Sequence, residues 1–304
     1  MLEHLAFRMN RRTFFLAALS LPWGLSARAN PPKTAQEAPP QARLAELEKT
    51  SGGRLGVYAI DTANGNRISH RADERFPLCS TFNLILASAV LARSTTSKGL
   101  LSRRVHYPRS SLVGYSPISE RHVDQGMTIA ELCGAAVQFS DNTASNLLLK
   151  AIGGPAGLTA YARSIGNRDF RLDRFETDLN TALPGDVRDT STPAAMAQSL
   201  RALTLGDALP PALKKQLNAW LLGSTTGTRR IRAALPSSWQ VGDKTGSGDY
   251  GTTNDLGTLG RRKGSPSSLP FITRKNTPMR NGARRCRVGS PHHRARLRPI
   301  LRFD

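Results

Sequence analysis

The stretch from Cys79 to Arg93 constrains the fold of this chain more than any other. It is apolar nearly all round, through Phe82, Leu84, Ile85, Leu86, Ala87, Ala89, Val90 and Leu91. A surface helix carries an apolar stripe at helical period, whereas a helix of this kind is buried on most sides or crosses a membrane. The stretch is too short to cross a bilayer, and polar residues flank it. We therefore expect a helix at the centre of a globular core.

Ser80 lies at the amino-terminal end of this expected helix. Backbone N–H groups at that end have no partner within the helix, and the helix dipole favours negative charge there. A serine in this place is either a helix cap or a nucleophile. On this stretch alone the cap is the commoner role, because Ser is a preferred cap residue.

The first 29 residues have the layout of an export signal. Three arginines precede an apolar run over residues 14–25, and the small-residue site Ala27-Arg28-Ala29 follows. Residues 9–16, which contain paired arginines, are similar to a twin-arginine signal. An amphipathic helix of the folded protein is the alternative. We expect a periplasmic protein with no membrane segment, whose mature chain begins near Asn30.

The net charge of +21 raises the question of a nucleic-acid partner. Residues 261–304 carry +12 of it and residues 1–29 carry +3, which leaves +6 for residues 30–260. That is an ordinary surface charge, so we expect no nucleic-acid partner. We also expect the protein to be a monomer. The chain has three cysteines, and no Cys/His spacing indicates a metal site, so we expect no metal and no other cofactor.

Strand and helix signals divide the chain into blocks. Residues 30–41 have the composition of a linker. Strands are expected at residues 54–61, 66–71, 239–245 and 252–259, the first two joined by an Asn-Gly hairpin turn. Helices are expected at residues 42–49, 128–139, 143–152, 194–205 and 210–222. No convincing strand signal occurs between residues 79 and 222.

Strand signals thus come from both ends of the chain, and helices fill the middle. The simplest packing is an α+β fold of sandwich type. An antiparallel sheet with helices is built from residues 30–78 and 223–260, and an all-helical domain, residues 79–222, is inserted between them. The groove between the two parts is the natural place for a site.

Three short motifs occur in order on a helix start, a loop and a strand. They are Ser80-Thr81-Phe82-Asn83, Ser140-Asp141-Asn142 and Lys244-Thr245-Gly246. Any one triplet is weak evidence, but together they resemble the S-x-x-K, S-D-N and K-T-G signature of the class A serine β-lactamases. The resemblance extends from about residue 44 to residue 260. The run over residues 241–255 is most similar to the broad-spectrum, cephalosporin-hydrolysing branch of that family.

The resemblance implies a β-lactamase/transpeptidase-like fold and hydrolysis of the β-lactam amide of penicillins and cephalosporins, which gives antibiotic resistance. Ser80 would be the nucleophile that forms an acyl-enzyme. Glu176 would be the base that activates water for deacylation, and Ser140 would relay a proton to the lactam nitrogen. The backbone N–H groups of Ser80 and Ser247 would bind the oxyanion.

The resemblance also implies groups that bind the small-molecule substrate or its water. Asn180 would position the water, and Lys244 would provide positive potential near the substrate carboxylate. The other substrate-binding residues implied are Asn142, Thr245, Ser247, Tyr115 and Arg230. For Arg230, an ordinary surface arginine is an equal alternative.

Two pairings depend on the resemblance. Arg174 and Asp189 would form the ion pair that closes the loop carrying Glu176, the alternative being two unrelated surface charges. Cys79 matches relatives that bridge this position to a cysteine, but the partner position here is Gly248, so that bridge cannot form. Cys79 and Cys133 are therefore expected to be buried thiols.

Asn83 is the first departure from the family pattern, which has a lysine three residues after the nucleophile. Asparagine cannot take up a proton at neutral pH. General-base assistance contributes about 10²–10⁴-fold to a rate. If the lysine is the acylation base in this family, Ser80 should acylate slowly; if Glu176 acts through water, acylation survives.

The second departure is the tail, residues 261–304, which is basic and shows no period of 2 or 3.6. We expect it to be disordered, as the product of a reading-frame shift near codons 259–261; a nucleic-acid-binding tail is the rival. A shift would remove one strand and one helix and leave an unpaired sheet edge.

Two rival functions follow from these departures. One is a penicillin-binding peptidase that is acylated but not deacylated, and the other is a catalytically dead β-lactam-binding relative.

Overall fold

The computed structural model describes residues 39–261 and 271–276. The expected export signal, most of the expected linker and most of the basic tail lie outside these residues.

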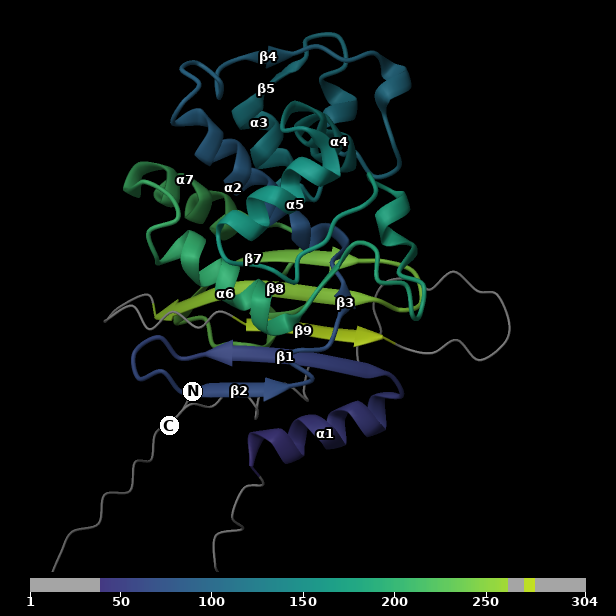
Figure 1. Ribbon diagram of the computed structural model, residues 1–304, viewed down its shortest axis with the longest axis vertical. Coiled ribbons are helices and arrows are strands. Elements are labelled where there is room, and N and C mark those ends of the chain that lie inside the picture. The colour runs from purple at the N-terminus through teal and green to yellow at the C-terminus, as the bar shows by residue number, and fades with distance from the viewer. Residues whose placement is uncertain (1–38, 262–270, 277–304) are drawn as a thin grey trace, which may run out of the picture. The chain divides into compact units, whose positions relative to one another are not determined.

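The main sheet has five antiparallel strands in the order β2-β1-β9-β8-β7 (Figure 1). The strands are β1 (Arg54–Ile60), β2 (Arg67–His70), β7 (Trp239–Ser247), β8 (Thr253–Arg261) and β9 (Phe271–Asn276). The sheet is thus built from both ends of the described chain, as the strand signals predict. β7 forms one edge, and this edge lies next to the helical part of the molecule.

Strand β9 corrects the expectation that nothing after residue 260 joins the sheet. It pairs with residues 54–59 of β1 on one side and with residues 253–257 of β8 on the other. A strand between two neighbours gains a hydrogen-bond ladder along both edges, so pairing outweighs the missing alternation of apolar and polar residues. The missing strand and the unpaired sheet edge that were expected are therefore not found here, since β9 pairs with both β1 and β8.

The helices cover both faces of this sheet. α1 (Pro40–Ser51) packs on β1 and β2 from one side, and α6 (Pro193–Thr204) packs on β1, β8 and β9 from the other. The remaining helices are α2 (Phe82–Ser94), α3 (Ile129–Gly134), α4 (Asn142–Ala151), α5 (Gly154–Ser164) and α7 (Pro211–Leu222). The expected helix at residues 128–139 is divided, because α3 continues as a π-helical turn, η4 (Ala135–Phe139).

Short strands and turns occur where no strand was expected. The short strands are β3 (Phe76–Pro77), β4 (Arg104–Val105), β5 (Met127–Thr128) and β6 (Thr190–Ser191), paired as β3 with β6 and β4 with β5. Three of these lie between residues 79 and 222, and two residues are too few to give a periodic signal. The 3₁₀ turns are η1 (Cys79–Thr81), η2 (Arg109–Ser111), η3 (Ser119–Arg121), η5 (Asp178–Thr181) and η6 (Ile231–Ala234).

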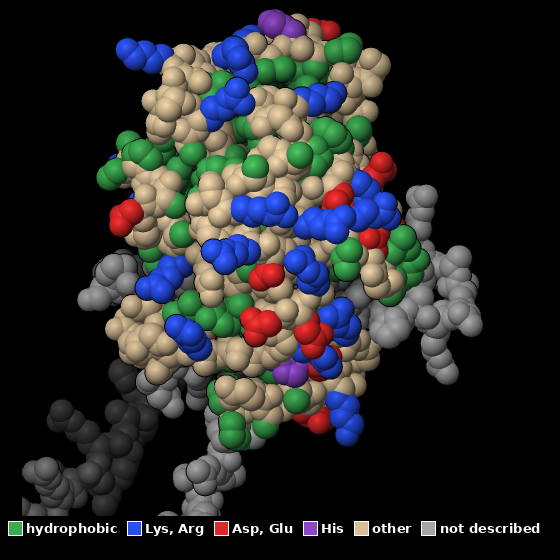
Figure 2. All heavy atoms as spheres, viewed as in Figure 1, with side chains coloured by type: hydrophobic (Ala, Val, Ile, Leu, Met, Phe, Trp, Pro, Cys, Tyr) green, Lys and Arg blue, Asp and Glu red, His purple; other side chains and the backbone are tan. Residues whose placement is uncertain are grey.

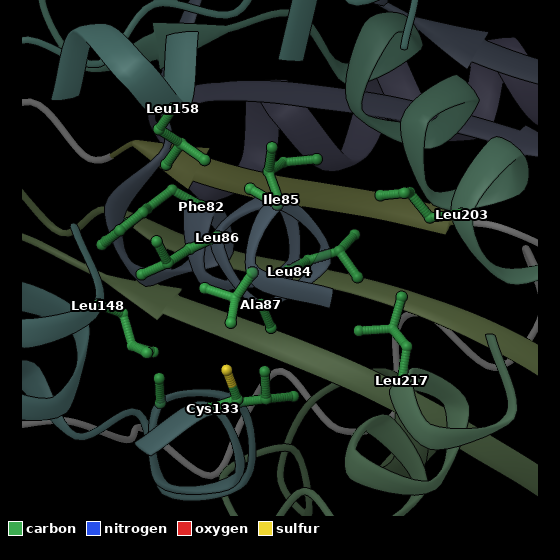
Figure 3. Packing of buried hydrophobic residues seen from close by; sticks show 14 of the residues in the cluster. Phe82, Leu84, Ile85, Leu86, Ala87, Cys133, Leu148, Leu158, Leu203 and Leu217 are labelled. Atoms are coloured by element: carbon green, nitrogen blue, oxygen red, sulfur yellow. The ribbon is translucent and has the colours of Figure 1, made fainter. Parts of the chain in front are cut away.

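Helix α2 is the centre of the larger core, as its composition predicts. Every residue from Phe82 to Leu91 is buried. Figure 3 shows its side chains surrounded by Cys133, Leu148, Leu158, Leu203 and Leu217 from other helices. Each buried Leu, Ile or Phe contributes about 1.5–3 kcal/mol to folding. Within the described residues, no helix has the length and apolar character needed to cross a bilayer.

A second, smaller core fills the opposite face of the sheet. Leu44 of α1 belongs there to a cluster with residues of four strands and of η6, among them Val57, Val241, Leu259 and Ile231. Successive strand residues point to opposite faces, so Tyr58 and Leu256 belong to the larger core instead. On the face seen in Figure 2, basic and acidic side chains are interspersed, in keeping with an ordinary surface charge.

The position of β9 makes Thr273 a test of the sheet. Thr273 pairs with Val57 on one side and Asp255 on the other. Thr273→Pro removes a ladder N–H from an inner strand, so we expect a loss of about 3 kcal/mol or more in the free energy of unfolding, measured by urea denaturation. Thr273→Ser keeps the N–H and serves as the control. Equal stability of the two variants would show that β9 does not pair in solution.

Candidate active site

Ser80 lies in the 3₁₀ turn η1, directly before α2, and is 7% exposed. Its Oγ donates a hydrogen bond to Oε1 of Glu176 at 3.2 Å. The first residues of η1 and α2 carry no side-chain cap. The cap interpretation of Ser80 is therefore wrong, because its hydroxyl contacts a carboxylate and no helix N–H group.

Hydrogen bonds hold both the backbone and the side-chain carboxylate of Glu176. Asn146 of α4 donates from Nδ2 to the Glu176 carbonyl at 2.8 Å and accepts from the Glu176 N–H at 2.9 Å. Asn180 Nδ2 donates to Glu176 Oε2 at 2.5 Å. Burial raises the pKa of Glu176 to about 7, against the hydrogen bonds from Ser80 and Asn180. A buried carboxyl with a pKa near neutrality beside a hydroxyl is suited to proton transfer.

Sequence reasoning missed Asn146. It follows Asn142 by one helical turn, so helical spacing from the Ser-Asp-Asn motif was the available signal.

The loop that carries Glu176 is closed by Asp189, which is fully buried. Its carboxylate accepts hydrogen bonds from the Asp173 and Arg174 N–H groups at 2.7 and 2.9 Å and from Arg174 Nε at 2.6 Å. Arg174 and Asp189 are therefore paired and are not unrelated surface charges. The pair fixes the two ends of the loop against each other.

Lys244 and Ser140 form a second contact across the site. Lys244, on β7, is fully buried and donates from Nζ to Ser140 Oγ at 2.8 Å and to the Thr245 carbonyl at 2.7 Å. Ser140 ends the π-helical turn with a left-handed backbone, φ 60°. Burial lowers the pKa of Lys244 to about 7, although the Glu176 carboxylate opposes this. The lysine of the third motif thus reaches the serine of the second.

Strand β7 passes close to η1 because residue 246 is glycine. A Cβ at Gly246 would lie 3.0 Å from the Leu78 carbonyl and 3.2 Å from the Ser80 nitrogen. This approach brings the end of β7, with Thr245 and Ser247, beside Ser80. Asn254 of β8 supports the same turn, donating to the carbonyls of Pro77 and Leu78 at 2.9 Å.

Arg230 belongs to this end of β7. Its guanidinium donates to Ser247 Oγ at 2.7 Å and to the Gly246 carbonyl at 2.8 Å, and it also contacts the Asn254 carbonyl. The alternative of an ordinary surface arginine is therefore wrong. All three acceptors are uncharged, so its positive charge is not neutralised by direct contact with any of them.

The other predicted substrate-binding residues line different parts of the site. Thr245 Oγ1 shares a hydrogen bond with Thr226 Oγ1 at 2.6 Å. Asn142 is buried and donates from Nδ2 to the Gly114 carbonyl at 2.7 Å. Tyr115, the residue after Gly114, is 63% exposed.

Asn83 is fully buried, and neither its Nδ2 nor its Oδ1 has a hydrogen-bond partner among the described residues. It lies in the first turn of α2, three residues after Ser80, so the two side chains emerge on one face. Lys244, the lysine of the third motif, donates a hydrogen bond to Ser140 and makes none to Ser80 within the described chain. Of the polar side chains in the three motifs, that of Asn83 alone has no hydrogen-bond partner within the part of the chain that the structure describes.

The structure confirms the expectation of two buried thiols. Cys79 and Cys133 are both buried. An added Cβ at Gly248 would lie 2.8 Å from Cys79 Sγ, so Gly248 stands where the resemblance places a bridging cysteine. Among the residues that the structure describes, no group of three or more His, Cys, Asp and Glu side chains could hold a metal.

The unpaired amide of Asn83 predicts a stability gain on substitution. A buried amide without partners costs about 1–3 kcal/mol, and Leu has a similar shape without polar atoms. We expect Asn83→Leu to raise the free energy of unfolding by about 1–3 kcal/mol in urea denaturation. The control is Ser88→Ala in the same helix, which removes a satisfied hydroxyl bonded to the Leu84 carbonyl. A less stable Asn83→Leu variant would mean that the amide is satisfied in solution.

Comparison with known proteins places this arrangement in a family. Residues 39–287 match the model of the β-lactamase enzyme family. The carbapenem-hydrolyzing β-lactamase KPC of Klebsiella oxytoca is 53% identical over 266 residues, which cover 87% of this chain and 89% of that relative. The β-lactamase Toho-1 of Escherichia coli is 54% identical over 245 residues, 81% of this chain and 84% of the relative.

Solved structures agree with these relatives. An ancestral class A β-lactamase (GNCA) matches with a TM-score of 0.79 and 52% identity, covering 86% of this chain and 97% of its own. The β-lactamase from Desulfarculus baarsii matches with a TM-score of 0.78 and 52% identity, covering 80% of this chain and 90% of its own. Identity of this size over most of both chains goes beyond a shared fold, and the chain belongs to the class A serine β-lactamase family.

Proposed function

We propose that this protein hydrolyses the β-lactam amide of penicillins and cephalosporins through an acyl-enzyme on Ser80, and that it does so with Glu176 as its general base. The observation that carries the proposal is the direct hydrogen bond from Ser80 Oγ to Glu176 Oε1, at 3.2 Å. In this chain the nucleophile already contacts a base whose pKa is raised to about 7 by burial.

In acylation, Ser80 Oγ attacks the lactam carbonyl carbon and its proton passes to Glu176. The backbone N–H groups of Ser80 and Ser247 stabilise the oxyanion; losing one such donor costs about 3 kcal/mol. The close approach of Gly246 to η1 supports this pairing of donors. When the C–N bond breaks, Ser140 gives its proton to the lactam nitrogen, and Lys244, at 2.8 Å from Ser140 Oγ, can replace it.

Before deacylation, the proton that Glu176 took from Ser80 passes to the deprotonated Lys244, which restores both groups. Glu176 then takes a proton from a water molecule, the hydroxide attacks the ester carbonyl of acylated Ser80, and Glu176 returns the proton to Ser80 Oγ as the ester bond breaks. Asn180, which contacts Glu176 Oε2, positions that water. The support from Asn146 and from the Arg174–Asp189 pair fixes the carboxylate at the required place. A penicillin-binding peptidase that is acylated but not deacylated does not need a base positioned in this way. The positioned carboxylate therefore argues against this rival function.

Substrate binding uses the positive end of β7. Arg230 and Lys244 attract the substrate carboxylate, Thr245 and Ser247 donate hydrogen bonds to it, and Asn142 binds the substrate's side-chain amide. Tyr115 forms the wall of the groove. We further propose that the chain is exported to the periplasm by its first 29 residues and works there as a monomer, where it confers β-lactam resistance.

Asn83 defines the second candidate function. Because its amide can neither accept a proton nor contact Ser80 as a cation, a catalytically dead β-lactam binder remains the specific competitor. The two candidates differ in whether Ser80 becomes acylated.

The intact mass of the chain during brief exposure to a penicillin decides between these candidates. We expect a transient adduct on Ser80 that decays, and an adduct that persists in Glu176→Gln, because deacylation loses its base. Asn83→Lys should acylate faster, by about 10²–10⁴-fold if a lysine there acts as a base. No adduct in a chain shown to be folded, with adduct in Asn83→Lys, would make the native protein the dead relative.

The pH dependence of kcat/KM is the second test. Glu176 must be deprotonated to act as base, so the rate should rise as pH increases through about 7. Lys244 must be protonated to attract the substrate carboxylate, so the rate should fall again as pH passes about 7. We expect a narrow bell centred near pH 7, and an alkaline limb shifted upward in Lys244→Arg, because arginine keeps its proton. An alkaline limb unchanged in that variant would assign it to another group.

A further inference from the structure

A second cavity lies between α3, η4 and α7, and none of the residues given a role at Ser80 lines it. Its volume is about 440 Å³, which is enough for a small organic molecule. Most of its wall is apolar, with Met127, Phe139 and Trp220 as the large side chains. The cavity is therefore a separate candidate site.

Two glycines allow α7 to lie close to this wall. A Cβ added at Gly134 of α3 would lie 3.4 Å from Trp220 Nε1, and a Cβ added at Gly223 would collide with Gln138 Nε2. Trp220 and Gln138 both line the cavity, and within the described residues neither the indole N–H nor the Gln138 side-chain amide has a hydrogen-bond partner. The apolar wall thus carries polar groups that are free to bind a ligand.

Glu131 supplies the charge of the cavity. Its Oε2 accepts a hydrogen bond from the Thr128 N–H at 2.7 Å, whereas its Oε1 accepts none and the carboxylate makes no ion pair with any described residue. The hydrogen bonds with Thr128 lower the pKa of Glu131, and the more distant Arg104 and His122 lower it further. His122 is the only other titratable side chain among the described residues that line the cavity. The carboxylate is therefore charged at neutral pH and favours a cationic ligand.

The spacing along α3 and η4 fixes the size of that ligand. Glu131 and Gln138 are seven residues apart, and Gly134, which contacts Trp220, lies between them. One helical turn advances about 5.4 Å, so the carboxylate and the indole lie about one turn apart along the same face. A cation joined to an aromatic ring by a short chain spans this distance.

We propose that this cavity binds a primary arylalkylamine. The ammonium group donates to Glu131 Oε1, and the aromatic ring packs against Trp220, Phe139 and Met127. An anion of the same shape meets the Glu131 charge and is excluded. The occupant also packs against η4, the turn that ends at Ser140.

Isothermal titration calorimetry of the full chain at pH 7 tests the ligand class. The probes are 2-(1-naphthyl)ethylamine, the uncharged 2-(1-naphthyl)ethanol and the anion 1-naphthylacetate. We expect saturable binding of one amine per chain, binding of the alcohol weaker by about 10-fold or more, and no binding of the anion, because a hydrogen bond to a charged group is lost. Equal affinity for amine and alcohol, or measurable binding of the anion, would overturn the proposal.

Two variants assign the binding to this cavity. Glu131→Gln keeps the capping box, since Gln serves at that position as well as Glu, but removes the charge. We expect its affinity for the amine to fall to that for the alcohol. Ala130→Leu fills the cavity and should abolish binding of both probes, whereas Ala160→Leu, the same change at an exposed position of α5, should leave binding intact. Amine binding unchanged in Glu131→Gln would sink the assignment, whether or not Ala130→Leu folds.

Hydrogen exchange followed by NMR gives an independent readout. The Gln138 carbonyl accepts from the N–H and from Oγ1 of Thr225, both at 2.9 Å. An occupant that holds η4 in place should therefore slow exchange of the Thr225 N–H, and this protection should disappear in Glu131→Gln at the same amine concentration. Binding that leaves Thr225 exchange unchanged would place the amine elsewhere. None of these measurements uses a β-lactam, so their outcome is independent of the proposed function.

Discussion

The burial of α2 is the constraint on which the rest of this structure depends. Its residues from Phe82 to Leu91 are buried, so the helix cannot shift or rotate without exposing core surface. The η1 turn at its start is therefore fixed in space, and Ser80 with it. Strand β7 can come close to this turn only because residue 246 is glycine, and that approach completes the site from the side of the sheet.

Burial also sets the electrostatics of the site. Removal from water raises the pKa of Glu176 and lowers that of Lys244, so that both stand at about 7. Each group partly opposes the shift of the other, because each charge favours the other's charged form. The result is a carboxyl and an amine whose pKa values both lie near neutral pH, the first in contact with Ser80 and the second with Ser140.

Asn83 is the motif residue whose buried polar side chain is least well satisfied by hydrogen bonds within the described residues. An amide whose two polar atoms both lack a partner among the described residues weakens the folded state. In the function we propose, the direct hydrogen bond between Ser80 and Glu176 provides a route to acylation that needs no residue at position 83. The expected effects on stability and the proposed effects on catalysis both arise at position 83, where this protein departs from the pattern of its family.

The sequence by itself determined the central helix, the sheet built from both chain ends and the three motifs, because these depend on local pattern and spacing. It could not decide whether Ser80 is a cap, whether Arg230 is a surface residue or whether Arg174 pairs with Asp189, since each depends on residues far away in the chain. Asn146 was missed although helical spacing from Asn142 was an available signal, because only its contact with Glu176, far away in the chain, gives it a role. Strand β9 is the clearest case: its residues lack a strand pattern, and only the unfilled ladders of β1 and β8 on either side make it a strand. Local pattern fixes which elements can form, whereas partners brought together by folding decide which polar groups are satisfied, and with them the chemistry of the site.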